Sequence, residues 1–176
     1  MKDAVLLVDG NDRVIGTEEK IKAHQDGGKL HRAFSIFVFN NKGEMLLQKR
    51  AKSKYHFGGL WTNACCSHPK PEEPMEKTIH KKLKQEMGFD TKLKEIFTFT
   101  YRAESENGLT EHELDHVFVG SFDGNPKPNP EEADEWKWVK TDELQKDVRK
   151  NPEKYSPWFR TALGKVLEYS EITAGD

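Results

Sequence analysis

The stretch Ala33–Arg50, with the sequence AFSIFVFNNKGEMLLQKR, decides the fold. Residues 33–39 form an apolar run rich in branched and aromatic side chains, which is typical of a buried strand. Residues 40–43, Asn-Asn-Lys-Gly, favour a turn, and residues 44–50 return as a second strand. The stretch therefore predicts a β-hairpin, the clearest local structure in the chain.

The rest of the chain predicts further strands and a few helices. Strands are expected at residues 4–8, 96–101, 113–122 and 135–140. Residues 17–24 predict a short polar helix or an extended arm. Helices are expected at residues 76–87, where Gly88 follows as a stop signal, and after Ser156 and Pro157. These elements predict an α+β fold, an α/β/α sandwich in which helices flank a mixed sheet.

Length and composition predict one domain. The chain has 176 residues, of which 35% are hydrophobic and 33% charged, and its formal net charge is -2. Residues 1–176 are therefore expected to form a single domain with its own core. The mixed charge argues against a nucleic acid as the main partner. No stretch approaches the roughly 20 apolar residues of a membrane helix, so we expect a cytoplasmic protein without a membrane partner.

The segment Trp61–Pro69, WTNACCSHP, carries both cysteines of the chain. Side chains two apart in an extended chain point to the same face. Cys66 and His68 are therefore expected to face one pocket, and Cys65 and Ser67 to face away from it. A disulfide between neighbouring cysteines is strained, so buried, metal-ligating or catalytic thiols are the expectation.

A second group of chemically active side chains is Glu111-His112-Glu113, at the mouth of a predicted strand. Strand geometry puts both carboxylates on one face, where they repel unless one is protonated or a cation lies between them. The alternative is an exposed strand with solvated acids. Together with His24, His31 and His68 they would suit Mn²⁺, Mg²⁺ or Zn²⁺. The remaining histidines are interpreted as surface or satisfied core residues: His56, His80, His112 and His116.

The predicted helix at residues 76–87 carries Lys82 and Glu86 one turn apart on one face. They form either a surface ion pair, worth a few tenths of a kcal/mol, or a carboxylate that holds Mg²⁺ beside a cation that faces phosphate. The charge run Lys49–Lys54 offers further cations, or is simply solvated. The sequence contains no P-loop or dinucleotide-binding glycine loop.

The same region resembles the Nudix box, G-x5-E-x7-R-E-U-x-E-E-x-G-U, in which U is a bulky apolar residue. Glu73, Glu86 and Gly88 match the pattern. The other positions are substituted: Ser67 replaces the first glycine, Lys81 replaces the arginine, and Lys82 and Gln85 replace two of the glutamates. Only Glu86 remains of the glutamates that hold hydrolytic metal ions. The resemblance therefore implies a Nudix-type mixed sheet that performs a different reaction.

The wider pattern resembles type I isopentenyl-diphosphate isomerases, the branch of the Nudix superfamily that isomerises without hydrolysing. The resemblance runs from about Leu7 to Trp158. It rests on His24 and on the motifs LHRAFS at 30–35, KRA at 49–51, GLWTN at 59–63, CSHP at 66–69, YRA at 101–103, EHE at 111–113 and YSPW at 155–158. Together these motifs are specific, whereas none is specific alone.

Carried over by position, the resemblance implies a role for each candidate residue. The implied catalytic residues are Cys66 and Glu113, supported by the aromatic side chains of Tyr101 and Trp158. The implied ligands of one metal ion, Mn²⁺, Zn²⁺ or Mg²⁺, are His24, His31, His68, Glu111 and Glu113. A second ion, a Mg²⁺ that arrives with the diphosphate, is assigned to Glu86 and the carbonyl of Cys66. The implied diphosphate contacts are Lys20, Arg50, Lys54, Ser67 and Lys82.

The implied reaction interconverts isopentenyl diphosphate and dimethylallyl diphosphate, in isoprenoid biosynthesis. Cys66 and Glu113 would add and remove protons on opposite faces of the substrate, through a tertiary carbocation. The partner is therefore a small allylic or homoallylic diphosphate, and the expected state is a monomer or weak homodimer. Two alternatives stay open: a Nudix hydrolase of a nucleoside or other diphosphate, and a non-enzymatic metal-binding or interaction module on the same scaffold.

Overall fold

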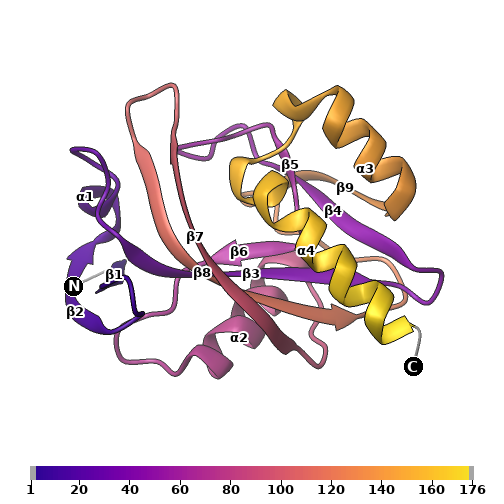
Figure 1. Ribbon diagram of the computed structural model, residues 1–176, viewed down its shortest axis with the longest axis horizontal. Helices are drawn as coiled ribbons and strands as arrows, with labels where there is room; N and C mark the ends of the chain where they lie inside the picture. The colour runs from indigo at the N-terminus through magenta and orange to yellow at the C-terminus, as the bar shows by residue number, and fades with distance from the viewer. Residues whose placement is uncertain (1–2, 175–176) are drawn as a thin grey trace.

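The structure, a computed structural model, describes residues 3–174 (Figure 1). In this range the strands are β1 (Ala4–Val8), β2 (Val14–Glu19), β3 (His31–Phe39), β4 (Glu44–Arg50), β5 (Trp61–Thr62), β6 (Cys65–Ser67), β7 (Lys94–Glu104), β8 (Thr110–Ser121) and β9 (Ala133–Lys140). The helices are α1 (Lys20–Ala23), α2 (Met75–Met87), α3 (Thr141–Lys150) and α4 (Pro157–Ala174), with a 3-10 helix η1 (Pro152–Lys154).

Strand β3 lies at the centre of a mixed sheet. It pairs in parallel with β8 along its whole length, and antiparallel with the short strand β6. Strand β8 pairs antiparallel with β7, and β1 and β2 continue the sheet beyond the first residue of β3. The predicted α+β class with a mixed sheet is confirmed.

The predicted hairpin forms its turn, but its two strands then separate. The turn is closed by a hydrogen bond from the N–H of Gly43 to the carbonyl of Asn40, at 3.0 Å. Strands β3 and β4 pair only at Phe39 and Met45. Beyond that point β4 pairs with β9 and β5, whereas β3 pairs with β8 and β6. The sheet thus consists of two half-sheets, and residues 61–67 cross from one to the other.

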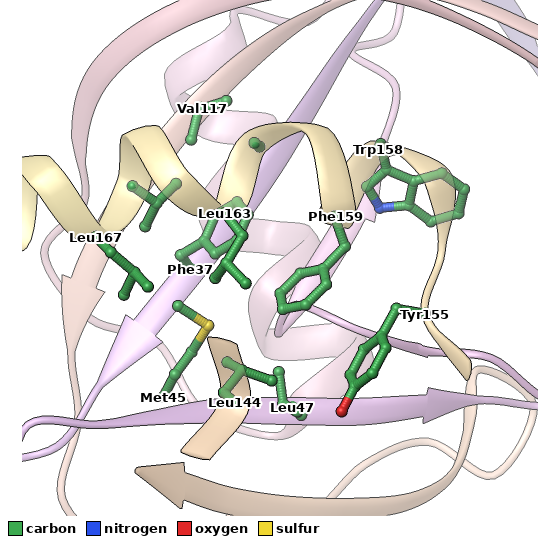
Figure 2. Close-up of a cluster of buried hydrophobic side chains, with 12 residues drawn as sticks. Phe37, Met45, Leu47, Val117, Leu144, Tyr155, Trp158, Phe159, Leu163 and Leu167 are labelled. Carbon is green, nitrogen blue, oxygen red and sulfur yellow. The ribbon is translucent and has the colours of Figure 1, made fainter. Parts of the chain in front are cut away.

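Helices cover both faces of the sheet (Figure 1). On one face Ile79, Leu83 and Met87 of α2 pack against a group of β-strand residues that includes Phe34, Ile36, Val38 and Leu46. On the other face α4 packs through residues that include Phe159, Leu163 and Val166 against Phe37, Met45 and Leu47, and Leu144 of α3 joins this cluster (Figure 2). Alternate residues of β3 therefore serve two cores, and the predicted α/β/α sandwich is confirmed.

Several local predictions differ from the structure, among them the ends of β7, which runs from Lys94 to Glu104 where residues 96–101 were predicted. Residues 17–24 divide between the end of β2 and the single turn α1. Strand β8 begins at Thr110, three residues earlier than predicted, because its polar first residues are buried in the sheet. Helix α3 was not predicted, because its apolar side consists of only two residues, Leu144 and Val148, one turn apart. Among residues 3–174, no helix combines the length and the apolar character needed to span a membrane.

Candidate active site

Strand β8 directs three acidic side chains to one face. Glu111, Glu113 and Asp115 are 2%, 5% and 1% exposed, whereas His112 between the first two is half-buried. The two glutamates share a face, as strand geometry predicts. The sequence motifs do not include Asp115, although it continues the same spacing of two.

Three imidazoles join these glutamates. The ligand atoms of five side chains all lie within 4.8 Å of one another: His24, His31, His68, Glu111 and Glu113. His68 Nε2 lies 3.2 Å from Glu113 Oε2, and His24 Nε2 lies 3.4 Å from Glu111 Oε2. The separation between His31 Nε2 and Glu113 Oε2 is 3.9 Å.

Backbone carbonyls orient two of the imidazoles. Since a carbonyl only accepts, the Nδ1–H of His24 donates to the carbonyl of Lys20 at 2.6 Å, and that of His31 to Lys29 at 2.8 Å. Each ring then directs its Nε2 lone pair into the cluster, where Nε2 has no hydrogen-bond partner. Burial lowers the pKa of His24, and lowers that of His31 to about 4. Both rings are therefore neutral, as metal ligation requires.

The two glutamates differ in pKa. Burial, and next the charge of Glu113, raise the pKa of Glu111 well above its usual range. Burial also opposes ionisation of Glu113, but the neighbouring side chains of Glu111 and His68 outweigh it and hold the pKa of Glu113 well below its usual range. The Nε2 atoms of His24, His31 and His68 and the Oε2 atom of Glu111 are buried without hydrogen-bond partners. This donor set, nitrogen and oxygen together, fits a divalent cation.

Strand pairing brings the phenol of Tyr101 beside Glu113. Tyr101 of β7 and His31 of β3 lie opposite Glu113, one on each side of β8. The hydroxyl of Tyr101 donates to Glu113 Oε1 at 2.6 Å. Burial, followed by the charge of Glu113, raises the pKa of Tyr101 well above its usual range. The phenol therefore remains a hydrogen-bond donor to the carboxylate.

The thiol of Cys66 projects from β6, which lies beside β3. Trp158 Nε1 donates to the sulfur at 3.1 Å, and the thiol donates to Asn63 Oδ1 at 3.2 Å. Burial, and next the charge of Asp115, raise the pKa of Cys66 to about 12. At neutral pH this side chain is therefore a protonated thiol.

Cationic side chains line the same cavity: Lys20, Arg50, Lys54 and Lys82. Two carboxylates accompany them, Glu86 and Glu132, and Lys54 Nζ lies 2.8 Å from Glu132 Oε2. Burial, and next the charge of Glu132, raise the pKa of Glu86 to about 7. This part of the cavity suits an anion that brings its own metal ion.

One cavity of about 570 Å³, including its opening to solvent, is lined by most of these groups. Its lining includes every predicted catalytic and diphosphate-binding residue: Cys66, Glu113, Tyr101, Trp158, Lys20, Arg50, Lys54, Ser67 and Lys82. It also includes Glu86, His68 and Glu111, whereas His24 and His31 are fully buried beside it. The prediction that Ser67 faces away is wrong, because β6 ends there and strict alternation stops with it. Cys65 faces away from the cavity, as predicted, and is buried in the core cluster that includes residues of α2.

The interpretation of His56 as a surface or satisfied core residue is also wrong. His56 is 7% exposed, lines the cavity and contacts Glu111 through Nε2. Its ring stacks on Tyr55 with centroids 4.1 Å apart. His56 lies in the irregular segment between β4 and β5, where no periodicity could reveal its direction. Outside the cavity, His80 pairs with Asp90 at 2.7 Å and His116 with Asp12 at 2.9 Å.

Comparison with known proteins agrees with this geometry. The family model described as "NUDIX domain" matches residues 29–159. "Isopentenyl-diphosphate Delta-isomerase 2" of Aromatoleum aromaticum is 52% identical over 167 residues, covering 95% of this chain and 88% of the relative. "Isopentenyl-diphosphate Delta-isomerase" of Serratia proteamaculans is 47% identical over 163 residues, covering 93% and 90% of the two chains. This chain belongs to the isopentenyl-diphosphate Delta-isomerase family. The predicted family is thereby confirmed.

Solved structures show that this member of the isomerase family has the Nudix fold. A crystal structure from Deinococcus radiodurans superposes with a TM-score of 0.77 at 16% identity, covering 92% of this chain and 98% of the other. A MutT protein from Methanosarcina mazei Go1 superposes with a TM-score of 0.66 at 17% identity, covering 80% and 95%. Nudix enzymes use divalent metal ions, and the cluster of histidines and glutamates in this member could hold one.

Proposed function

We propose that this protein interconverts isopentenyl diphosphate and dimethylallyl diphosphate, in isoprenoid biosynthesis. The observation that carries the proposal is a single cavity lined by the Cys66 thiol, the Glu113 carboxylate and a group of cationic side chains. The names of relatives at 52% and 47% identity support the same reaction. The thiol and the carboxylate supply acid–base chemistry, and the cations supply a diphosphate site.

Cys66 and Glu113 move the protons. Isomerisation adds a proton to one carbon of the alkene and removes another from a neighbouring carbon, through a tertiary carbocation. In each direction of the reaction one of the two groups donates and the other accepts, and the reverse direction exchanges their roles. Tyr101 holds the Glu113 carboxylate through its 2.6 Å hydrogen bond. Glu113 is buried and Cys66 is half-buried, which limits the access of water to the cation.

Trp158 shields the carbocation. Its side chain is 3% exposed, lines the cavity and is fixed by the contact of Nε1 with the Cys66 sulfur. An indole face stabilises a desolvated cation by about 2 kcal/mol. Because the indole has no free nucleophilic group, it stabilises the carbocation without forming a covalent bond to it.

The diphosphate is an anchor that does not react. Four cationic side chains and a hydroxyl bind it: Lys20, Arg50, Lys54, Lys82 and Ser67. These side chains offset the charge of the diphosphate and hold its position, so that the hydrocarbon end of the substrate is aligned with the thiol and the carboxylate. Glu86 and the Cys66 carbonyl would hold the Mg²⁺ that accompanies the diphosphate.

His24, His31, His68, Glu111 and Glu113 would hold the other ion, for which we propose Mn²⁺, Zn²⁺ or Mg²⁺. The unpartnered imidazole nitrogens and the paired carboxylates support this assignment. Bound there, the ion would neutralise the two acids and polarise the Glu113 carboxylate. We further propose that residues 1–176 act as one domain, in the cytoplasm, as a monomer or weak homodimer without nucleic-acid or membrane partners.

A Nudix hydrolase of a nucleoside or other diphosphate is the second candidate. The retained Nudix-box residues Glu73 and Glu86 favour it. Glu73 Oε2, however, lies 3.9 Å from Lys81 Nζ, and lysine and glutamine occupy two glutamate positions of the box. Hydrolysis would therefore have fewer metal-binding carboxylates than the box normally provides.

Incubation of the metal-loaded protein with isopentenyl diphosphate in heavy water tests the proposal. NMR should show dimethylallyl diphosphate and deuterium in both product and recovered substrate, because both proton transfers are reversible. Absence of both isomerisation and exchange would refute the isomerase. Phosphate release from a panel of nucleoside diphosphates, without exchange, would favour the hydrolase.

A further inference from the structure

Asn63 is fully buried where the two half-sheets separate. It lies between β5, which pairs with β4, and β6, which pairs with β3. Its side-chain Nδ2 donates to the carbonyls of Ile36 and Cys65, each at 3.0 Å. Since both of these atoms are acceptors, the NH₂ group of the amide must face them. The amide oxygen therefore points away from these two carbonyls.

That oxygen receives two hydrogen bonds. Thr62 Oγ1 lies 2.8 Å from Asn63 Oδ1, and Cys66 Sγ lies 3.2 Å from it. An amide oxygen only accepts, so both the hydroxyl and the thiol must donate. Ser156 Oγ lies 2.8 Å from Thr62 Oγ1, and because the Thr62 proton is committed to Asn63, Ser156 is the donor in that bond. The orientation of one buried amide thus determines which group donates in each hydrogen bond of this series, which runs from Ser156 through Thr62 to Asn63 and from Cys66 to Asn63.

The sulfur has two further polar neighbours. Trp158 Nε1 donates to Cys66 Sγ at 3.1 Å. The Ser35 hydroxyl lies 3.7 Å from the sulfur, but it donates its hydrogen bond to Asp115 Oδ2 at 2.6 Å. The thiol therefore has one strong donor neighbour and one acceptor-only neighbour. It contacts neither the histidine cluster nor a cationic side chain through these bonds.

We propose that Asn63 is a positioning residue that fixes the Cys66 thiol proton in one rotamer, with Thr62 and Ser156 holding the amide oxygen in place. An unrestrained thiol rotates about its Cβ–Sγ bond, and proton transfer to carbon depends on the direction of the S–H bond. Only the predicted effect on turnover rests on the proposed function, because the direction of the S–H bond can be measured without substrate.

Infrared spectroscopy of the S–H stretch, which absorbs where other protein groups do not, tests the proposal directly. Loss of one band in Cys66→Ala identifies the band of this thiol among the two cysteines. In Asn63→Ala the Cys66 band should move to higher frequency and broaden, because the thiol loses its acceptor and samples several rotamers. An unchanged band in a folded Asn63→Ala protein would overturn the proposal.

Thr62→Val and Thr62→Ser form a matched pair that decides the question if Asn63→Ala does not fold. Valine removes the hydroxyl, so Asn63 Oδ1 accepts from the thiol alone and the Cys66 band should move to lower frequency. Serine keeps the hydroxyl and should preserve the wild-type band. If the S–H band of Cys66 were identical in Thr62→Val and in the wild type, the proposed role of the Thr62 and Asn63 hydrogen bonds would be contradicted.

Turnover provides the second readout. In Asn63→Ala, kcat should fall about tenfold, the usual effect of one lost neutral hydrogen bond, while KM for isopentenyl diphosphate stays close to that of the wild type. Thr62→Ser should retain kcat, whereas Thr62→Val should lower it. A change in KM alone would refute a positioning role. If the wild-type protein shows no isomerisation, the infrared result still decides whether Asn63 orients the thiol.

Discussion

At the scale of single residues, the two adjacent cysteines lie in different surroundings. Cys66 lines the cavity and contacts Trp158 through its sulfur. Cys65 is fully buried on the side of α2, with its sulfur 3.5 Å from Glu86 Oε2. Only one of the two thiols can therefore reach a substrate in the cavity.

Substitution of Cys66 by alanine should lower kcat for isomerisation about 100- to 10,000-fold, because an acid–base group contributes in that range. Cys65→Ala is the matched control and should stay within a few-fold of the wild type. Steady-state kinetics with isopentenyl diphosphate measure both variants, and circular dichroism checks their folding. Full activity in a folded Cys66→Ala protein would remove the thiol from the mechanism.

Substitution of Tyr101 by phenylalanine removes the 2.6 Å hydrogen bond to Glu113 but keeps the ring. A hydrogen bond to a charged group contributes about 1.5–3 kcal/mol, so kcat should fall about 10- to 100-fold. KM should change little, because the hydroxyl does not lie among the cationic side chains. An unaltered kcat would show that the phenol does not act on the carboxylate.

Glu86 should make the metal-free protein less stable at high pH. Its pKa of about 7 in the folded protein lies above the ordinary value of 4.5, so its contribution is fully present below pH 4.5 and is lost as the pH rises through 7. At pH 8, Glu86→Gln should therefore exceed the wild type by about 3 kcal/mol in free energy of unfolding. Urea denaturation at pH 4.5, where the two proteins should agree, is the control.

The spacing of residues predicts part of the site, and the folding of loops determines the remainder. Glu111 and Glu113 share a face because strand geometry requires it, and Asp115 could have been found by the same rule. His56 could not, because its segment between β4 and β5 has no regular geometry. The Asn63 amide likewise gains its role from contacts with distant Ile36 and nearby Cys66, which no local pattern shows.

At the scale of elements, helix α2 ends at a crowded glycine. Gly88 has φ 78°, and a Cβ at this position would lie 2.7 Å from the carbonyl oxygen of Lys127. The close approach is held by a 2.8 Å hydrogen bond from the N–H of Lys127 to the carbonyl of Met87. The glycine thus allows both the left-handed turn and the contact with the loop before β9.

Gly88→Ala should lose more stability than Gly108→Ala, which provides the matched control. Gly108 has a similar φ of 82°, but a Cβ there would meet nothing within 4 Å. In both variants the left-handed conformation lowers the free energy of unfolding by about 1–2 kcal/mol. At Gly88, steric strain lowers it by about 1–3 kcal/mol more. Urea denaturation compares the two, and equal losses would show that the loop moves away without cost.

Elements with strong local signals agree with their predictions. Strands β1 and β4 have the predicted bounds, and α2 buries Ile79, Leu83 and Met87 as their spacing of four predicts. The separation of β3 from β4 could not be read locally, because it depends on β8 and β9, which lie far along the chain. Local sequence fixes the turn, whereas competition among distant strands selects the partners.

At the scale of the whole molecule, metal binding should be coupled to folding. The five residues of the cluster come from different parts of the chain and meet only in the folded state. An ion present at 1,000 times its Kd should therefore add about 4 kcal/mol to the free energy of unfolding. Calorimetry with Mn²⁺ or Zn²⁺ measures this effect, and a chelator should reverse it.

Two histidine variants separate specific from nonspecific binding in that experiment. His31→Ala should lose most of the stabilisation by metal ions, because it removes one ligand of the cluster. His80→Ala should retain it, because His80 lies on α2 and pairs with Asp90. Equal stabilisation of both variants would place the bound ion elsewhere.

The parallel pairing of β3 with β8 also has a consequence for the order of events during synthesis. Ser35 and Asp115, joined across these strands, are 80 residues apart in the chain. Pairing of such distant segments must close a long loop, which is a slow step in folding. While the ribosome is still producing β7, β3 has no parallel neighbour, and the unpaired N–H and C=O groups along that edge are available to other nascent chains. Rapid completion of β8 should therefore protect the nascent protein from aggregation.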